Sequence, residues 1–374
     1  MDAITPRTGE FARRVLVLQG GGALGSYQGG VYEGLAEADF RPDWIAGISI
    51  GAINAAIIAG NKPEDRLPRL REFWETTSAV VPYSMEMPDS LTRTYMSGAA
   101  AAWVASVGVD GFFKPRFPPA YAYPAGAPEA LSYYDTMPLR DTLTKLVDFD
   151  RINGREVRLS LGATNIRSGE LIYFDNETHR IGPEHVMASG ALPPGFPPIE
   201  IDGEHYWDGG VVSNTPLQYV LTTDSKDDLV IFQVDLFNAR GPLPRNLLEV
   251  AEREKDIRYA SRSAHSTEQA LKIHEAKVAL RQLLASLPPE LRGTPNVELL
   301  GDISYENAVT VVKLIYRRRP FEGPSKDYEF SRQTMHDHWK AGLADLRKAM
   351  EKRSDMTCER HRVLTKTIEP EPAT

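Results

Sequence analysis

The sequence contains a single cysteine among its 374 residues. Cys358 therefore cannot form an intrachain disulfide, and the chain is compatible with a reducing compartment. Long apolar runs are missing too: residues 46–60 and 99–109, the longest weakly polar stretches, fall short of the ~20 residues that a membrane-spanning helix needs. The first apolar run, residues 15–18, is too short for the core of a signal peptide. We therefore expect a cytoplasmic protein.

An excess of positive charge is also absent. The chain has 43 Lys and Arg residues against 51 Asp and Glu residues, for a formal net charge of -8. Nucleic-acid-binding proteins need a net positive surface, so we expect no nucleic-acid partner. The composition, 42% hydrophobic and 25% charged, is typical of a globular protein. The length suits two average domains, or one large α/β domain with a helical extension.

A glycine-rich loop follows the first predicted strand, residues 15–19, and precedes residues with helical spacing. The loop consists of Gly20, Gly21, Gly22, Ala23, Leu24 and Gly25. Glycines let the backbone approach a bound group closely and point successive N–H donors into one concavity. Such a concavity suits either a phosphate or the oxyanion of an acyl-transfer intermediate.

The same loop permits a rival interpretation. The spacing of Gly20, Gly22 and Gly25 matches the fingerprint of dinucleotide-binding folds. Those folds place an acidic residue at the tip of the second strand, about 20 residues further on, to bind the ribose. Here the second strand ends instead in Gly-Ile-Ser at residues 47–49. We therefore favour the oxyanion interpretation and expect no cofactor.

Ser49 lies in a sharp turn between a predicted strand, residues 44–48, and a predicted helix, residues 52–59. Residues two positions from such a serine crowd the flanking backbone unless they lack a Cβ, and Gly47 and Gly51 satisfy that demand. Unpaired N–H groups at the start of the helix favour negative charge on the serine oxygen or on a bound intermediate. The Gly-x-Ser-x-Gly pattern also occurs as a simple turn, but its context makes Ser49 a candidate nucleophile.

Asp208 is the second candidate residue, and Gly209 and Gly210 follow it. Asp-Gly-Gly can be a simple type I′ turn. The aromatic residues Tyr206 and Trp207 before it favour a position at the rim of an active site. A carboxylate with glycine neighbours can be approached closely by a second loop, as a base must be if it is to meet a serine hydroxyl.

The remaining pattern predicts further helices and strands. Helices are expected over residues 63–77, 139–146, 184–189, 246–264, 267–287 and 330–352. Strands are expected over residues 157–164, 171–174, 228–236 and 308–316. The tail, residues 367–374, is expected to be disordered.

Residues 80–132 interrupt this regular pattern. Prolines and aromatic residues crowd residues 112–130, and prolines interrupt both helices and sheets. Our hypothesis is a lid, or an access segment for the acyl chain, above Ser49. The alternative is a surface excursion packed on the domain.

Taken together and in this order, the glycine loop, the turn at Ser49 and the Asp-Gly-Gly at Asp208 resemble the patatin-like phospholipase family. Residues 188–198 are similar to the corresponding passage of that family. The resemblance covers residues 12–240 and implies a catalytic domain with an α/β fold, a three-layer α/β/α sandwich with a largely parallel central sheet. Residues 241–366 are predicted to form a mainly helical C-terminal extension that packs on the core or mediates formation of a homodimer.

The resemblance also implies acyl-ester hydrolysis of lipids by a Ser-Asp dyad. Ser49 would be the nucleophile, Asp208 the proton acceptor and the backbone of residues 20–25 the oxyanion hole. Leu24 departs from the pattern, because many relatives have Arg or Lys there, and it removes a cation that could orient the loop or anionic headgroups. We expect a lipid or acyl-ester substrate and transient contact with a membrane surface. Phospholipids, acylglycerols and hydroxyalkanoate oligomers all stay open as substrates.

A Ser-Asp-His triad is the nearest alternative mechanism. It would need a histidine that follows the aspartate in the chain. The histidines in that position are His265, His274, His336, His338 and His361. Each lies in a charged helical setting that favours a solvated or packing role, as we also expect for His179, His185 and His205. His336 and His338 would diverge on a helix, so we assign no metal site.

The non-enzymatic alternative is an interaction module in residues 241–374. Amphipathic helices and the three arginines at residues 317–319 could bind a partner subunit or an anionic membrane surface. We favour the view that these helices cover the sheet.

Overall fold

The computed structural model describes residues 13–78, 90–223, 227–304, 307–317, 322–351 and 365–368. The strands of its main sheet are β1 (Arg13–Leu18), β2 (Trp44–Ile48), β5 (Arg158–Asn165), β6 (Leu171–Asp175), β7 (Ile199–Ile201), β8 (Glu204–Asp208), β9 (Leu229–Asp235), β10 (Val309–Ile315) and β11 (Thr365–Ile368). The helices are α1 (Ser26–Glu37), α2 (Ile50–Ala59), α3 (Pro63–Thr77), α4 (Ser90–Val107), α5 (Met137–Leu146), α6 (Phe149–Asn153), α7 (Pro183–Ser189), α8 (Leu217–Thr222), α9 (Leu247–Ala285), α10 (Pro289–Arg292), α11 (Pro295–Asp302) and α12 (Arg332–Glu351).

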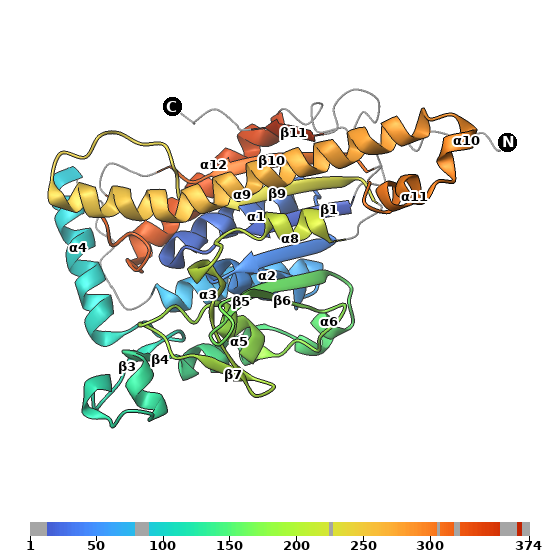
Figure 1. Cartoon of the computed structure of the whole chain (residues 1–374). Coiled ribbons are helices and arrows are strands. Elements are labelled where there is room, and N and C mark those ends of the chain that lie inside the picture. The colour runs from blue at the N-terminus through green and yellow to red at the C-terminus, as the bar shows by residue number, and fades with distance from the viewer. Residues whose placement is uncertain are drawn as a thin grey trace.

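A nine-stranded sheet forms the centre of the molecule (Figure 1). Its order is β11-β10-β9-β1-β2-β5-β8-β7, and β6 also pairs with β5. Neighbouring strands from β11 to β5 are parallel. The strands β6, β7 and β8 pair in the antiparallel sense. The prediction of an α/β fold with a largely parallel central sheet is therefore confirmed.

The central strands are buried on both faces because helices cover both sides of the sheet. In β1, Leu16 and Leu18 face one hydrophobic core, whereas Val15 and Val17 face the other. Helices α1, α2, α3 and α12 pack on the first face, and α8 packs on the second. The long helix α9 contributes Ala260 to the first core and Ala270 and Leu271 to the second. Within the described residues, no helix combines the length and the apolar character that crossing a bilayer requires. The result is the predicted three-layer sandwich, with strands that appear in the sequence as continuous apolar runs.

Most predicted elements are present with shifts of one or two residues at their ends. The helix expected over residues 63–77 is α3, and the strand expected over residues 228–236 is β9. The helix expected over residues 330–352 is α12. These elements have strong apolar periodicity, which tertiary packing reinforces.

One long helix, α9, replaces the two helices predicted over residues 246–264 and 267–287. Asn246 caps its start, since the side-chain oxygen accepts the Glu249 N–H at 2.9 Å. Neither proline nor glycine occurs within the helix. The predicted break at residues 265–266 is wrong, because the polar residues there do not interrupt the backbone hydrogen bonds.

The C-terminal region is mainly helical, as predicted, but it also supplies β10 and β11 to the central sheet. In this parallel pair, Val311 lies opposite Thr367 and Val312 opposite Ile368. The disordered tail predicted from residue 367 onward is therefore wrong for Thr367 and Ile368, because pairing with β10 orders them. Residues 369–374 lie outside the described part of the chain. The boundary after residue 240 stays a prediction.

The described part of the predicted access segment begins with α4, which runs along one side of the molecule (Figure 1). Residues 112–130 are irregular, as predicted: the strand β3 (Lys114–Pro115) and the 3-10 turns η2 (Ala120–Ala122) and η3 (Pro128–Leu131) are joined by loops. The strand β3 pairs with β4 (Tyr134–Asp135). Residues 80–89 lie outside the described residues.

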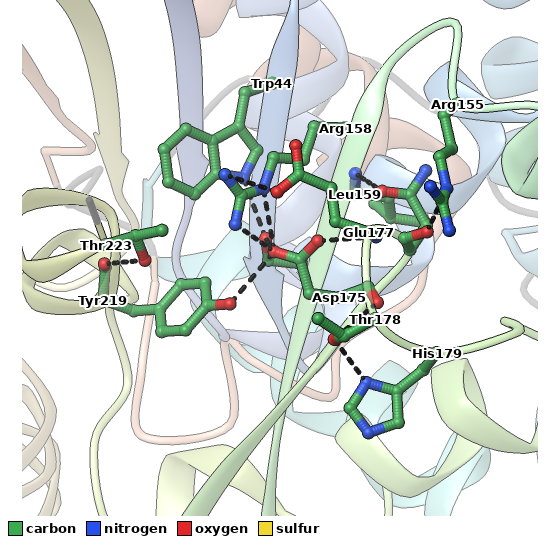
Figure 2. Close-up of polar contacts among 12 residues, drawn as sticks. Trp44, Arg155, Arg158, Leu159, Asp175, Glu177, Thr178, His179, Tyr219 and Thr223 are labelled. Atoms are coloured by element: carbon green, nitrogen blue, oxygen red, sulfur yellow. Dashed lines mark hydrogen bonds and ion pairs between the residues drawn. The ribbon is translucent and has the colours of Figure 1, made fainter. Parts of the chain in front are cut away.

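A buried polar cluster surrounds Asp175 at the N-terminal end of β2 (Figure 2). Its carboxylate accepts hydrogen bonds from Arg158 Nε at 2.9 Å and Ser160 Oγ at 2.7 Å. The Tyr219 hydroxyl donates a third at 3.0 Å, and the Arg158 guanidinium lies 4.1 Å from the ring centroid of Trp44. Burial alone would raise the pKa of Asp175, but hydrogen bonds from Arg158, from a backbone N–H and from Ser160 lower it overall. The cluster therefore holds an ionised carboxylate that ties β2, β5, β6 and α8 together.

Candidate active site

Ser49 lies between β2 and α2 in a strained backbone conformation, with φ 58° and ψ -126°. A Cβ on Gly47 would lie 2.4 Å from the Gly51 carbonyl oxygen, and a Cβ on Gly51 would lie 2.4 Å from the Leu18 carbonyl oxygen. Both positions therefore need glycine. The structure has the sharp turn from strand to helix that the sequence predicts, and the serine side chain lines a cavity.

The backbone of Ser49 is fixed from outside the turn. Its N–H lies 3.1 Å from both the carbonyl oxygen and the Oγ of Ser189. The Ser189 hydroxyl in turn donates to the Gly162 carbonyl oxygen at 2.6 Å. Because this N–H is already engaged, it is not available to a bound substrate. Ser189 orients the turn and was not identified as a functional residue from the sequence.

Asp208 ends β8, and its position is fixed by its neighbours. Its N–H donates to the Ala191 carbonyl at 3.0 Å, and its own carbonyl accepts the Thr164 hydroxyl at 3.0 Å. Its carboxylate accepts the Gly210 N–H at 2.7 Å, and the Ser49 side chain lies close enough to lower its pKa. The two sequence-predicted residues therefore lie near each other and line the same cavity.

The Asp208 side chain is only 1% exposed, and this burial raises its pKa to about 7. The nearby Ser49 side chain and the hydrogen bond from the Gly210 N–H favour the ionised form and limit the rise. A carboxyl group with such a pKa is partly ionised near neutral pH. It can therefore accept a proton from a hydroxyl far better than an ordinary aspartate can.

The glycine loop offers fewer free donors than the sequence predicts. The Gly20 N–H donates to the Asn214 carbonyl at 3.2 Å, and the Asn214 side-chain amide donates back to the Gly20 carbonyl at 2.9 Å. The Ala23 N–H donates to the Asp327 carbonyl at 2.7 Å, and Leu24 N–H to the Gly21 carbonyl at 3.2 Å. The N–H groups of Gly20, Ala23 and Leu24 are therefore engaged within the protein, and the oxyanion hole expected over residues 20–25 stays a prediction.

Two loop donors are left. Among the described residues, the N–H groups of Gly21 and Gly22 have no hydrogen-bond partner, and both glycines line the cavity that contains Ser49. Gly22 has φ 55°, and a Cβ there would lie 2.0 Å from the Asp327 carbonyl oxygen, so glycine is required. Leu24, where relatives have a cation, is fully buried. Gly25 lies against Ile50, since a Cβ there would be 2.5 Å from that side chain.

A cavity of about 580 Å³ opens above Ser49 and Asp208. Its aromatic walls are formed by Phe112, Phe113, Tyr133, Tyr134, Phe196, Phe237, Tyr259, Tyr328 and Phe330. The predicted access segment contributes four lining residues, Val104, Ala105, Phe112 and Phe113. An apolar cavity of this size, with few polar groups at its base, suits an acyl chain.

None of the described histidines lines this cavity. His185 accepts the Gly182 N–H at 3.0 Å, and His274 Nε2 lies 3.1 Å from the Asn307 carbonyl oxygen. Within the described residues, no group of three or more His, Cys, Asp or Glu side chains is arranged to hold a metal ion.

A family model described as "Patatin-like phospholipase" matches residues 16–221, and a second, described as "Patatin phospholipase", matches residues 257–361. The first match spans more than half of the 374 residues, and the chain therefore belongs to the patatin-like phospholipase family. By class it is a lipid ester hydrolase. The predicted family and the predicted enzyme class are both confirmed.

Solved structures with similar folds include VipD from Legionella pneumophila, with 14% sequence identity and a TM-score of 0.42. That match covers 92% of this chain and 68% of VipD. ExoU from Pseudomonas aeruginosa, solved in complex with SpcU, has 16% identity and a TM-score of 0.31, with 76% of this chain and 60% of ExoU covered. No curated protein gives a significant match.

Two further residues at the site lie outside the motifs. Asn214 follows the Asp-Gly-Gly motif by a few positions. An asparagine just after a predicted catalytic loop is a sequence signal from which its role at the site could have been predicted. Asp327 lies far along the chain, and its contact is made through a backbone carbonyl that every residue type has. The residue type at position 327 therefore gives no signal of this contact.

Proposed function

We propose that this protein cleaves carboxylic esters of lipids with Ser49 as nucleophile and Asp208 as proton acceptor. The observation that carries the proposal is that Ser49 lines the same cavity as the buried carboxyl group of Asp208, whose pKa is raised to about 7. A serine hydroxyl is a poor nucleophile until its proton is removed in the transition state. Asp208 has both the position and the basicity for that task.

In the first step, Ser49 Oγ bonds to the carbonyl carbon of the ester while its proton moves to Asp208. The carbonyl oxygen becomes an oxyanion, and the free N–H groups of Gly21 and Gly22 are the donors placed to stabilise it. When the tetrahedral intermediate collapses, the alcohol leaves with the proton from Asp208. Ser49 is then acylated.

In the second step, water attacks the acyl-enzyme while Asp208 accepts one of its protons. Collapse of the second tetrahedral intermediate breaks the bond to Ser49 Oγ, which recovers the proton from Asp208. The fatty acid leaves. Each donor of an oxyanion hole contributes ~3 to 4 kcal/mol to transition-state stabilisation, so the glycine loop is as important as the dyad.

The apolar cavity supports a substrate with a long acyl chain, and we propose phospholipase A or general lipid acyl hydrolase activity. The described part of residues 80–132 would then serve as an access segment, because Val104, Ala105, Phe112 and Phe113 line the cavity. Exposed aromatic side chains of the same segment, Trp103, Phe117 and Tyr121, suit transient contact with a lipid surface.

The decisive experiment is a panel of esters that varies chain length and headgroup, assayed with the wild type, Ser49→Ala and Asp208→Ala. We expect a loss of at least about a thousandfold in kcat for each variant, since the members of such a dyad act as a unit. A preference for hydroxyalkanoate oligomers over phospholipids would contradict the proposed substrate class but not the proposed mechanism. Full activity in Ser49→Ala would refute the proposal.

The alternative Ser-Asp-His triad is tested by histidine variants. No described histidine lines the cavity, so replacing His185, His274 or His338 with alanine should leave the activity per folded molecule largely intact. The same substitutions at His265, His336 and His361 complete the series of histidines that follow Asp208. A loss of several orders of magnitude at one histidine would favour the triad.

A further inference from the structure

A short segment of the C-terminal region forms part of the cavity wall. Asp327, Tyr328 and Phe330 line the same cavity as Ser49, although they follow α9 and β10 in the chain. The segment lies beyond residue 240, where the predicted catalytic domain ends. The cavity is therefore incomplete without the C-terminal region.

The same segment touches the glycine loop directly. The Asp327 carbonyl oxygen accepts the Ala23 N–H at 2.7 Å. It also lies so close to Gly22 that a Cβ there would be 2.0 Å away. This carbonyl thus fixes the loop on the side next to the free N–H groups of Gly21 and Gly22. A displacement of these donors by about 1 Å would weaken the stabilisation of the transition state, because an oxyanion hole depends on donors that are in position before the reaction.

Lys255 of α9 holds Asp327 in place. Its ammonium group lies 2.5 Å from the Asp327 carboxylate and donates to the Pro324 carbonyl oxygen at 3.2 Å. It also lies 5.4 Å from the ring centroid of Tyr328. The Lys255 and Asp327 side chains are 23% and 18% exposed. Because they are largely withdrawn from water, their attraction is less screened than that of a surface pair.

A second lysine anchors the segment to the same face of α9. Lys326 is 3% exposed, and its ammonium group lies 2.6 Å from the Asp256 carboxylate and 3.4 Å from the Glu252 carboxylate. Residues 252, 255 and 256 lie within one helical turn and therefore share a face of the helix. Two lysines, one on α9 and one on the segment, thus pair with carboxylates of the other element and fasten residues 324–328 to α9.

We propose that Lys255 is a positioning residue for the oxyanion loop. Through Asp327 it fixes Ala23 and Gly22, so that the N–H groups of Gly21 and Gly22 converge on the carbonyl oxygen of the substrate. This inference rests on the proposed hydrolase function, and it makes α9 part of the catalytic apparatus. It also means that residues 12–240 do not contain everything that activity requires.

The test compares three variants of the full chain: Lys255→Met, Asp327→Asn and the double variant. Lys272→Met is the matched control, because Lys272 pairs with Glu268 on the exposed side of the same helix. The kinetic substrate is a short-chain nitrophenyl ester, which depends little on the cavity walls. Hydrogen exchange of the peptide that contains Ala23 reports on the loop independently of activity, and Ser49→Ala is assayed in parallel.

We expect each single variant to lower kcat about tenfold, less than the ~10²–10³ that follows the loss of a whole oxyanion donor. KM should stay within about threefold, exchange at Ala23 should rise, and the double variant should be no worse than either single one, as for partners in one interaction. Lys272→Met should match the wild type.

Several results would overturn the inference. These are unchanged exchange at Ala23 in Lys255→Met, an unchanged kcat, a change confined to KM, or additive losses in the double variant. Retention of activity by Ser49→Ala would instead refute the proposed function. In that case the exchange measurement still decides whether Lys255 holds the loop.

Discussion

Gly20 and Asn214 are joined by two hydrogen bonds that run in opposite directions between the glycine loop and the loop after Asp208. The Gly20 N–H donates to the Asn214 carbonyl at 3.2 Å, and the Asn214 side-chain amide donates to the Gly20 carbonyl at 2.9 Å. A Cβ on Gly20 would lie 2.4 Å from the Asn214 Oδ1. The two loops of the site are therefore fixed to each other as well as to the sheet.

Replacing Asn214 with alanine should lower kcat about tenfold and destabilise the protein by ~1–3 kcal/mol, because a buried carbonyl loses its donor. Steady-state kinetics and urea denaturation measure the two effects. Asn61→Ala is the control, since the Asn61 amide donates to two backbone carbonyls, those of Ile57 and Leu146, away from the cavity. It should reduce stability without changing kcat. Equal loss of kcat in both variants would contradict a specific role for Asn214.

The activity should rise with pH through an apparent pKa of about 7. Burial raises the pKa of Asp208 to about 7, and only the ionised carboxylate can accept the Ser49 proton. Below that pH the carboxyl group is neutral and the rate falls tenfold for each unit of pH. The measurement is kcat/KM for a soluble ester between pH 5 and 9. A profile that is flat over this range would show that Asp208 is not the base.

Asp208→Asn should be more stable than the wild type at alkaline pH while being inactive. A carboxyl group whose pKa is raised on folding contributes stability below its unfolded pKa and loses it as the pH rises through its folded value, here about 7. At pH 8.5, the ionised Asp208 carboxylate destabilises the wild type by at most ~4 kcal/mol. Urea denaturation should show that the free energy of unfolding of the variant, relative to that of the wild type, is higher at pH 8.5 than at pH 5.5. No difference between the two pH values would contradict the raised pKa.

Asp175→Asn should destabilise the protein by ~3–5 kcal/mol, because the buried Arg158 guanidinium loses its buried charge partner and keeps only Glu177, whose side chain is 44% exposed. The pKa of Asp175 is lowered on folding, so this stability is present above the unfolded pKa and is lost as the pH falls through the folded value. Asp150→Asn is the control, since the Asp150–Arg180 pair is exposed and should be worth less than ~1 kcal/mol. Equal effects of the two substitutions on urea denaturation would refute the structural importance of the buried cluster.

Ala105→Trp should shift the chain-length preference toward short esters, because Ala105 of α4 lines the cavity and a larger side chain fills part of it. We expect kcat/KM to fall at least about tenfold more for a twelve-carbon ester than for a four-carbon ester, because a few methylene groups of the longer chain lose their apolar binding site. Ala102→Trp is the control, because Ala102 lies on the same helix but does not line the cavity. An unchanged preference in Ala105→Trp would remove the access-segment hypothesis.

The parts of the site that the sequence predicts are those where local chemistry restricts the residue type. Gly47 and Gly51 must be glycine because neighbouring carbonyl oxygens leave no room for a Cβ, and such requirements are visible as a motif. Asp208 is predicted for a similar reason, because the Gly210 N–H reaches back to its carboxylate. The central strands are predicted because burial on both faces leaves only apolar residues.

Other features depend on contacts between distant segments and could not be predicted. The Asp327 carbonyl that occupies the Ala23 N–H is a backbone group, so no side-chain pattern marks it. The same holds for β11, where pairing with β10 orders Thr367 and Ile368. The continuity of α9 across residues 265–266 was missed because polar residues favour a helix end only weakly.

The position of β10 has a consequence for biosynthesis. The strand β9 pairs with β1 on one side and with β10 on the other, so a nascent chain keeps an open, apolar sheet edge until Ile315 has left the ribosome. At 5–20 residues per second, roughly 4 to 16 seconds separate the emergence of β9 from that of β10. A chain truncated within α9 would therefore leave this edge of β9 unpaired, and an open apolar strand edge favours aggregation.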